Sequence, residues 1–377
     1  MTPVADSLSS FWRDLNDRVR EHARMRGTSP QDELRQWVLQ RVMVRLFDAQ
    51  PDAWTVKGGQ IQLAHWPDAR STGDVDLSAT EEVPAQVMAE RYSRALEQDY
   101  GDHLSFVPGQ IDNSIMGTGR AARMLHTAYL GDKVLMEVQT DAVLPDSRPR
   151  WKPLKDVPFP EHIHPSGDSR ENPSLRMLEP HDVLLHKITG MHMMSWNGAP
   201  PFRVQDMVDT LFLSERLHLD GPEMHAILQK EVAYQNAEYG RLRMPSDRFA
   251  LPNPNWHEGY ASYAAATPGL SHKTLESAVP AAQRFLDPLL GPEPPQADWN
   301  PQRKEWVPRS DQEAREGEAR RNVAGVSALD NPRGAVPDLR GVRGRGGGAA
   351  RGPGHDRGLG ARGPHDPRRG QGRGRGA

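Results

Sequence analysis

Apolar side chains recur with two different periods along the first half of the chain, and each period predicts a kind of element. Between residues 6 and 25, Leu8, Trp12, Leu15 and Val19 lie three or four positions apart, which is typical of an amphipathic helix. Alternating apolar and polar residues between turn signals are typical of strands. We expect helices over 6–25, 30–47 and 83–100, and strands over 54–56, 70–79, 104–107, 124–130 and 134–138. Because hairpins and helices are interspersed, the pattern predicts a mixed sheet and an α+β fold.

The second half is mainly helical by its apolar pattern. Stripes at helical spacing predict helices from 179 to about 194 and over 203–217, 222–233, 260–266 and 275–290. A Pro- and Arg-rich segment before them, 145–174, predicts a long connection, and Pro-rich 291–302 is expected to end the packed region. We therefore expect an N-terminal lobe over 1–150, a connecting loop over 151–175, a helical C-terminal lobe over 176–299 and a disordered tail over 300–377.

Charge is distributed unevenly along the chain. The formal net charge is -3, but the segment from Arg333 onward carries 11 Arg and 3 Asp in Arg-Gly repeats. The body is therefore acidic, and any phosphate ligand needs a local cluster of cations or metal ions. Arg-Gly repeats can bind single-stranded nucleic acid, although a solvated extension is at least as good an interpretation.

The absence of cysteine excludes disulfides, thiolate zinc sites and cysteine nucleophiles. The N-terminus resembles no signal peptide, and the sequence has no stretch apolar enough to span a membrane. We expect a soluble cytoplasmic protein with no membrane partner.

One short stretch carries the first candidate chemistry. In residues 70–77, Asp74 and Asp76 are two apart on a predicted strand, so both carboxylates point to the same face. Such a pair can hold Mg²⁺ or Mn²⁺ ions, which assist phosphoryl or nucleotidyl transfer. Thr72 supplies a nearby hydroxyl, and Gly58 and Gly59 would let backbone amides approach phosphate oxygens. A plain surface turn ending in a strand with exposed acids is the alternative.

A second group of candidates lies on two later helices. Lys187 stands between apolar neighbours on the helix that begins near Glu179, where it would meet a triphosphate or extend into water. Arg203, Asp206 and Asp209 are three apart and share one side of the next helix. They would either complete the metal-binding strand or form an ordinary surface ion pair. By helix spacing alone, Arg41, Arg45 and Arg70 would line a route for the acceptor.

These residues, in this order, resemble the AbiEii/AbiGii-type nucleotidyltransferase toxins of bacterial toxin–antitoxin systems. The resemblance rests on a Lys-Gly-Gly turn, an Arg followed by Thr and Asp-x-Asp-Leu, a Lys helix and Arg-x-x-Asp-x-x-Asp. It extends over about 40–215. The matching positions are Lys57, Gly58, Gly59, Arg70, Thr72, Asp74, Asp76, Lys187, Arg203, Asp206 and Asp209.

The resemblance implies a polymerase-beta-like nucleotidyltransferase fold and transfer of a nucleotide from an NTP to an acceptor. In some relatives that acceptor is the 3′ end of tRNA, which would block translation, and a cognate antitoxin restrains the enzyme. By resemblance, Asp74 and Asp76 would be catalytic metal ligands and Lys57, Gly58, Gly59, Thr72, Lys187 and Arg203 would bind the nucleotide. Asp206 and Asp209 would orient Lys187, bind metal or accept a proton.

The resemblance also implies a third carboxylate on a later strand. Glu137 is preferred because its neighbours alternate cleanly, and Asp141, four residues on and on the same face, is the alternative. Two other functions stay open at this stage. One is a nucleotidyltransferase that modifies a small molecule or a protein, and the other is a non-catalytic nucleic-acid-binding protein that uses the Arg-Gly tail.

Overall fold

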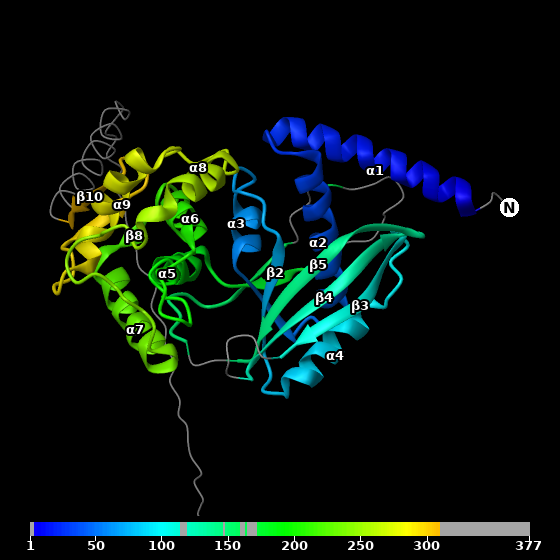
Figure 1. Ribbon diagram of the computed structural model, residues 1–377, viewed down its shortest axis with the longest axis horizontal. Coiled ribbons are helices and arrows are strands. Elements are labelled where there is room, and N and C mark those ends of the chain that lie inside the picture. Colours follow the sequence, from blue (N-terminus) through cyan, green and yellow to red (C-terminus); the bar gives the residue numbers. More distant parts are fainter. Residues whose placement is uncertain (1–3, 114–118, 146–147, 159–162, 164–171, 310–377) are drawn as a thin grey trace, which may run out of the picture. The chain divides into compact units, whose positions relative to one another are not determined.

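A seven-stranded mixed sheet forms the centre of the N-terminal part of the computed structural model (Figure 1). The structure describes residues 4–113, 119–145, 148–158, 163 and 172–309. In spatial order the strands are β3 (Leu104–Asp112), β4 (Ala121–Leu130), β5 (Lys133–Val143), β2 (Asp74–Ala79), β1 (Trp54–Lys57), β7 (Leu175–Met177) and β6 (Lys155–Val157). The pairs β2/β5 and β1/β7 are parallel and the others antiparallel, which confirms the predicted mixed sheet.

Three helices accompany the β3–β5 part of the sheet. They are α1 (Val4–Arg26), α2 (Pro30–Ala49) and α4 (Ala85–Leu96). Helix α2 begins where the sequence predicted, because the Ser29 side chain accepts a hydrogen bond from the Asp32 amide and Pro30 occupies the first turn. Helix α4 contacts β3, β4 and α2, so it covers one face of the sheet.

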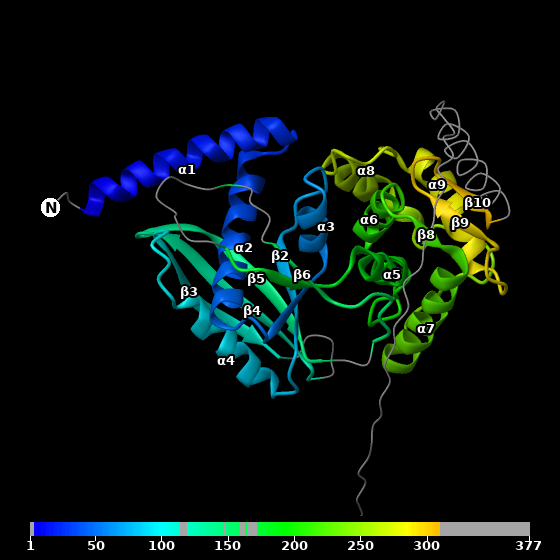
Figure 2. The ribbon, with the colours of Figure 1, turned by 180° about the vertical axis from the view of Figure 1, so that it is seen from behind.

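The helices of the second half are gathered next to the β1/β2 side of the sheet (Figures 1 and 2). They are α5 (Pro180–Gly190), α6 (Val204–Ser214), α7 (Gly221–Tyr239), α8 (His257–Ala265) and α9 (Leu275–Leu290). Short α3 (Gly59–His65) contacts β1, β2 and α5, so it lies where the sheet meets these helices. A hydrophobic core runs continuously from Phe11 to Trp299 through both halves.

Two expectations about the proline-rich segments are wrong. The expected long loop over 145–174 contains β6, and β7 directly follows it. The packed region also extends beyond 291–302, because β8 (Leu219–Asp220), β9 (Ala297–Asn300) and β10 (Glu305–Pro308) form a second sheet. Trp299 of β9 is 3 % exposed and its indole NH donates to Ser214 O at 2.6 Å, which attaches this sheet to the helices. The Arg-Gly segment lies outside the described residues.

The expectation that Arg41 and Arg45 line an acceptor route is also wrong. Both side chains are buried on α2 and bind the buried carboxylate of Asp102. Arg45 donates to both oxygens of Asp102 at 2.9 and 2.7 Å, and Arg41 Nε donates at 2.9 Å. These arginines therefore hold the turn before β3 and do not face a ligand.

Within the described part of the chain, every helix is too short or too polar to cross a lipid bilayer.

Candidate active site

The turn after β1 packs directly against the acidic strand. Gly58 has φ 66° and ψ -147°, a conformation that glycine adopts far more easily than other residues. A Cβ atom added there would stand 2.1 Å from Asp76 Oδ2, and one added to Gly59 would stand 3.2 Å from Thr72 Cβ. The positive φ and the close approach to β2 thus favour glycine at position 58, whereas a side chain at position 59 would have to displace Thr72 by a few tenths of an ångström.

The predicted acidic pair lies at the start of β2, a central strand of the seven-stranded sheet. Asp74 and Asp76 alternate with buried Val75 and Leu77, so both carboxylates point away from the core. Thr72 is buried, and its hydroxyl donates to Asp74 Oδ1 at 3.0 Å. Thr72 therefore orients the first carboxylate of the pair.

Asp76 has a charged neighbour on each side. It lies opposite Lys57 on β1 and opposite Asp141 on β5. Burial and the nearby charge of Asp74 raise the pKa of Asp76 to about 6. Concentrated negative charge of this kind is relieved by a bound cation.

The geometry favours Asp141, not Glu137, as the third carboxylate. The parallel pairing of β2 with β5 begins at Gln139, so Asp141 is next to Asp76. Glu137 is exposed, pairs with Thr127 on β4 and does not line the cavity described below. Arg123 of β4 donates to both oxygens of Asp141 at 2.8 and 2.7 Å. Of the two candidates left open by the sequence, Asp141 is therefore the better placed.

The Lys187 ammonium is held by the two acids of α6. Its Nζ atom lies 3.1 Å from Asp206 Oδ1 and 2.8 Å from Asp209 Oδ2. Asp209 also accepts two hydrogen bonds from Arg70, at 2.8 and 2.7 Å, and Asp206 accepts one from Arg203 Nε at 2.5 Å. Three cations from three separate segments thus surround two carboxylates.

Burial and pairing fix the charges of this cluster. Burial alone would lower the pKa of Lys187, but Asp206 and Asp209 together outweigh it and raise that pKa above its usual value. Burial likewise acts to raise the pKa of Asp209, but Arg70 and Lys187 outweigh it and hold this pKa well below the usual range. Asp206 and Asp209 are 0 % and 1 % exposed, and neither lines the cavity. They therefore orient cations instead of facing a ligand.

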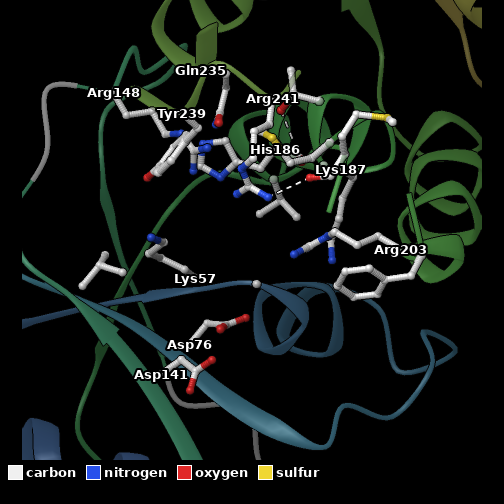
Figure 3. Close-up of a pocket in the computed structure, with 18 of the residues that line it drawn as sticks. Lys57, Asp76, Asp141, Arg148, His186, Lys187, Arg203, Gln235, Tyr239 and Arg241 are labelled. Atoms are coloured by element: carbon white, nitrogen blue, oxygen red, sulfur yellow. Dashed lines mark hydrogen bonds between the residues drawn. The ribbon is translucent and has the colours of Figure 1, made fainter. Parts of the chain in front are cut away.

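A cavity of about 480 Å³ lies between the sheet and the helices (Figure 3). On the sheet side, Asp76 and Asp141 lie beside each other, across the cavity from Lys187 and Arg203 (Figure 3). The charged side chains that line the cavity are Lys57, Asp76, Arg123, Asp141, Arg148, Lys187, Arg203 and Arg241. Cations dominate this set although the body of the protein is acidic, so the cavity suits a polyanion with bound metal.

Sequence analysis missed several of these residues. Arg123 lies four residues before Thr127 on β4, so both side chains share one face of the strand. Because Thr127 pairs with Glu137, alternation along the strands could have placed Arg123 on the face that carries Glu137 and Asp141. Arg148 lies at the start of the connection between the halves and Arg241 follows α7, and no local pattern marks either one. Of the expected arginines, Arg70 does lie in the cluster, bound to Asp209.

The residues present fit a substrate-linked divalent ion. In the described part of the chain, no group of three or more His, Asp or Glu side chains is arranged to hold a metal alone. Mg²⁺ in nucleotide-dependent enzymes commonly uses only one or two carboxylates together with substrate phosphates and water. Asp74 and Asp76 provide such a pair.

Comparison with known proteins identifies the family of the chain. A family model described as nucleotidyl transferase AbiEii toxin, type IV TA system, matches residues 41–288. No curated protein sequence matches the chain. Among solved structures, the nucleotidyltransferase toxin MenT4 from Mycobacterium tuberculosis is similar with 13 % identity and a TM-score of 0.47, over 73 % of this chain and 97 % of that one. JHP933 from Helicobacter pylori is similar with 13 % identity and a TM-score of 0.34, over 56 % and 81 % of the two chains.

The family match covers more than half of the chain and includes every residue on which the resemblance was based. The chain belongs to the AbiEii family of nucleotidyltransferase toxins of type IV toxin–antitoxin systems.

Proposed function

We propose that this enzyme transfers a nucleotide from an NTP to the 3′ end of tRNA, with Mg²⁺ bound by Asp74 and Asp76. The observation that carries the proposal is the cavity lined by Asp76 and Asp141 and by Lys187 and Arg203, with Asp74 two residues before Asp76 on the same face of β2. Family membership provides the nucleotidyltransferase reaction and rules out a protein that only binds nucleic acid. The metal, the acidic pair and the tRNA acceptor are our assignments.

A divalent ion at Asp74 and Asp76 would neutralise charge on the NTP phosphates and on the departing pyrophosphate. The chain's own contribution is to hold both carboxylates in place. Thr72 fixes Asp74 by its hydrogen bond, and the Gly58 turn closes against Asp76.

Cations on both sides of the cavity would bind the triphosphate. Lys57 projects from the sheet side, and Lys187 and Arg203 project from the helical side (Figure 3). The cluster of Lys187, Arg70, Arg203, Asp206 and Asp209 has three positive and two negative charges, so it keeps a net positive charge after internal pairing. Because these side chains are already ordered, little conformational entropy is lost when phosphate binds.

Asp141 is the residue that we assign to the acceptor hydroxyl. Its carboxylate lies beside Asp76 and lines the cavity, and Arg123 holds it in a fixed orientation. A positioned carboxylate can take the proton from an attacking hydroxyl in such reactions. Asp206 and Asp209 are buried, bind cations and do not line the cavity, so we assign them a positioning role.

The proposal is tested by incubating the full chain with each labelled NTP, Mg²⁺, total tRNA and protein extract, and following the label over time. We expect label in tRNA, loss of labelling on chelation of Mg²⁺, and loss with Asp74→Asn. Label in protein or small molecules and never in RNA would refute the tRNA acceptor. Labelling of tRNA that survives Asp74→Asn would refute the metal assignment. The type IV family also predicts that a cognate antitoxin suppresses the activity in cells.

A further inference from the structure

Two large aromatic side chains are exposed at the rim of the cavity. Trp196 is 64 % exposed and Phe202 is 70 % exposed, and both line the cavity. Both belong to the segment 191–203, which connects α5 to α6, with Trp196 near its middle and Phe202 near its end. Exposed aromatic surface is unfavourable in water, so its position beside a ligand cavity points to a binding role.

The segment that carries these rings is braced by hydrogen bonds. Ser195 N donates to Ala199 O at 3.0 Å, and Gly198 N donates to Ser195 O at 2.9 Å. Pro201 O accepts from the Trp256 indole NH at 3.0 Å and from Asn253 at 2.9 Å. The backbone next to both rings is thus fixed, although the rings themselves are exposed.

One face of Trp196 is covered by a cation. The guanidinium carbon of Arg241 lies 3.5 Å from the centre of the Trp196 ring, and Arg241 Nη1 donates to Met194 O at 2.7 Å. This stack orients the indole and leaves its remaining exposed surface available. An aromatic ring with a guanidinium beside it presents a stacking surface and a charge for the adjacent phosphate, which is how single-stranded nucleic acid is bound.

We propose that Trp196 and Phe202 stack on the unpaired nucleotides at the 3′ end of the RNA acceptor and guide that end into the cavity. The proposal rests on the RNA acceptor assigned above. The cations of the cavity lining complement the acceptor phosphates, whereas the acidic body of the protein disfavours binding of RNA elsewhere on it.

The test compares two RNA hairpins with the same stem, one with a four-nucleotide 3′ overhang and one with a blunt end. Binding to the full chain is measured by fluorescence anisotropy without NTP. We expect Trp196→Ala and Phe202→Ala each to raise the Kd for the overhang hairpin by about 5-fold to 150-fold, with the blunt hairpin unchanged. Trp196→Phe is expected to retain most of the affinity. Met25→Ala is the matched control, because Met25 is also 70 % exposed but does not line the cavity.

Three results would overturn the inference. They are an unchanged Kd for the overhang hairpin, an equal loss for both hairpins, and a KM for NTP that rises as much as the KM for RNA. The last would place the base of the NTP, not the acceptor, on the rings. If wild type binds the overhang, the variants lose that binding, and no label enters RNA, then the proposed acceptor reaction fails while the stacking site stands. Variants that bind RNA normally but escape the antitoxin would instead make this rim a protein interface.

Discussion

Substitution of Gly58 by alanine tests whether the turn after β1 sets the position of the catalytic carboxylate. The added Cβ would be 2.1 Å from Asp76 Oδ2, whereas real Cβ atoms are not found closer than 3.0 Å to such an atom. The carboxylate or the turn must therefore shift by roughly 1 Å, and a misplacement of about 1 Å costs on the order of 10²-fold in rate. We expect Gly58→Ala to lower kcat/KM for nucleotide transfer by about that factor.

The same substitution also strains the backbone, so a control is needed. Gly58 has φ +66° and Gly27, between α1 and α2, has φ +68°. Nothing lies within 4 Å of a Cβ added to Gly27, so Gly27→Ala carries a positive-φ cost of about 1–2 kcal/mol without a collision, and the ψ of -147° adds to this cost at Gly58. The assay measures labelled nucleotide incorporation together with the free energy of unfolding for both variants. If Gly58→Ala folds and its kcat/KM stays within about threefold of Gly27→Ala, the turn does not position Asp76.

Three further predictions follow from the same structure. Asp141→Asn should reduce kcat by about 10²-fold or more, as expected for loss of a catalytic acid–base group. The kcat of Glu137→Gln should stay near that of wild type, and equal losses in the two variants would contradict our choice of Asp141. Asp102→Asn should lower the free energy of unfolding by about 3–5 kcal/mol in denaturant titrations, because it leaves buried Arg45 without its carboxylate, and a loss below about 1 kcal/mol would contradict this. Burial lowers the pKa of His192 to about 4. The unfolded state, with a pKa near 6.5, then binds more protons, so stability falls as the pH drops through this window; wild type should lose about 2 kcal/mol more than His192→Gln between pH 7 and pH 5.

Short-range patterns predicted much of the fold because they reflect local physics. The helix start at Ser29 and Pro30 follows from capping, and the shared face of Asp74 and Asp76 follows from strand alternation. Strand register is different, because it is set by which strands become neighbours. Sequence alternation put Glu137 and Asp141 on one face of β5, but only the parallel pairing with β2 shows which of them is beside Asp76.

The sequence pattern also could not predict which faces of a helix are buried. Every residue from Gln36 to Phe47 of α2 is buried, so the helix has no solvent-facing flank there on which Arg41 could meet a ligand. From the sequence alone, a helix with charged residues on one side is interpreted as amphipathic, with that side in solvent. In the structure the charged residues Arg41 and Arg45 instead bind one carboxylate, that of Asp102. Likewise, the sequence around Trp299 is proline-rich and does not predict packing. Trp299 is buried because β8 and the helices provide a surface for it.

The order of the motif residues along the chain was informative about the cluster around Lys187, although it left the role of each residue open. Arg70 precedes β2 and binds Asp209 on α6, so one ion pair joins segments 139 residues apart and fixes the helices against the acidic strand. The Asp209 carboxylate is buried, does not line the cavity and has its burial compensated by Arg70 and Lys187, so we assign it no metal. Asp206 and Asp209 of α6 therefore contribute to the site by holding its cations in place. The spacing of residues in the sequence cannot show these contacts.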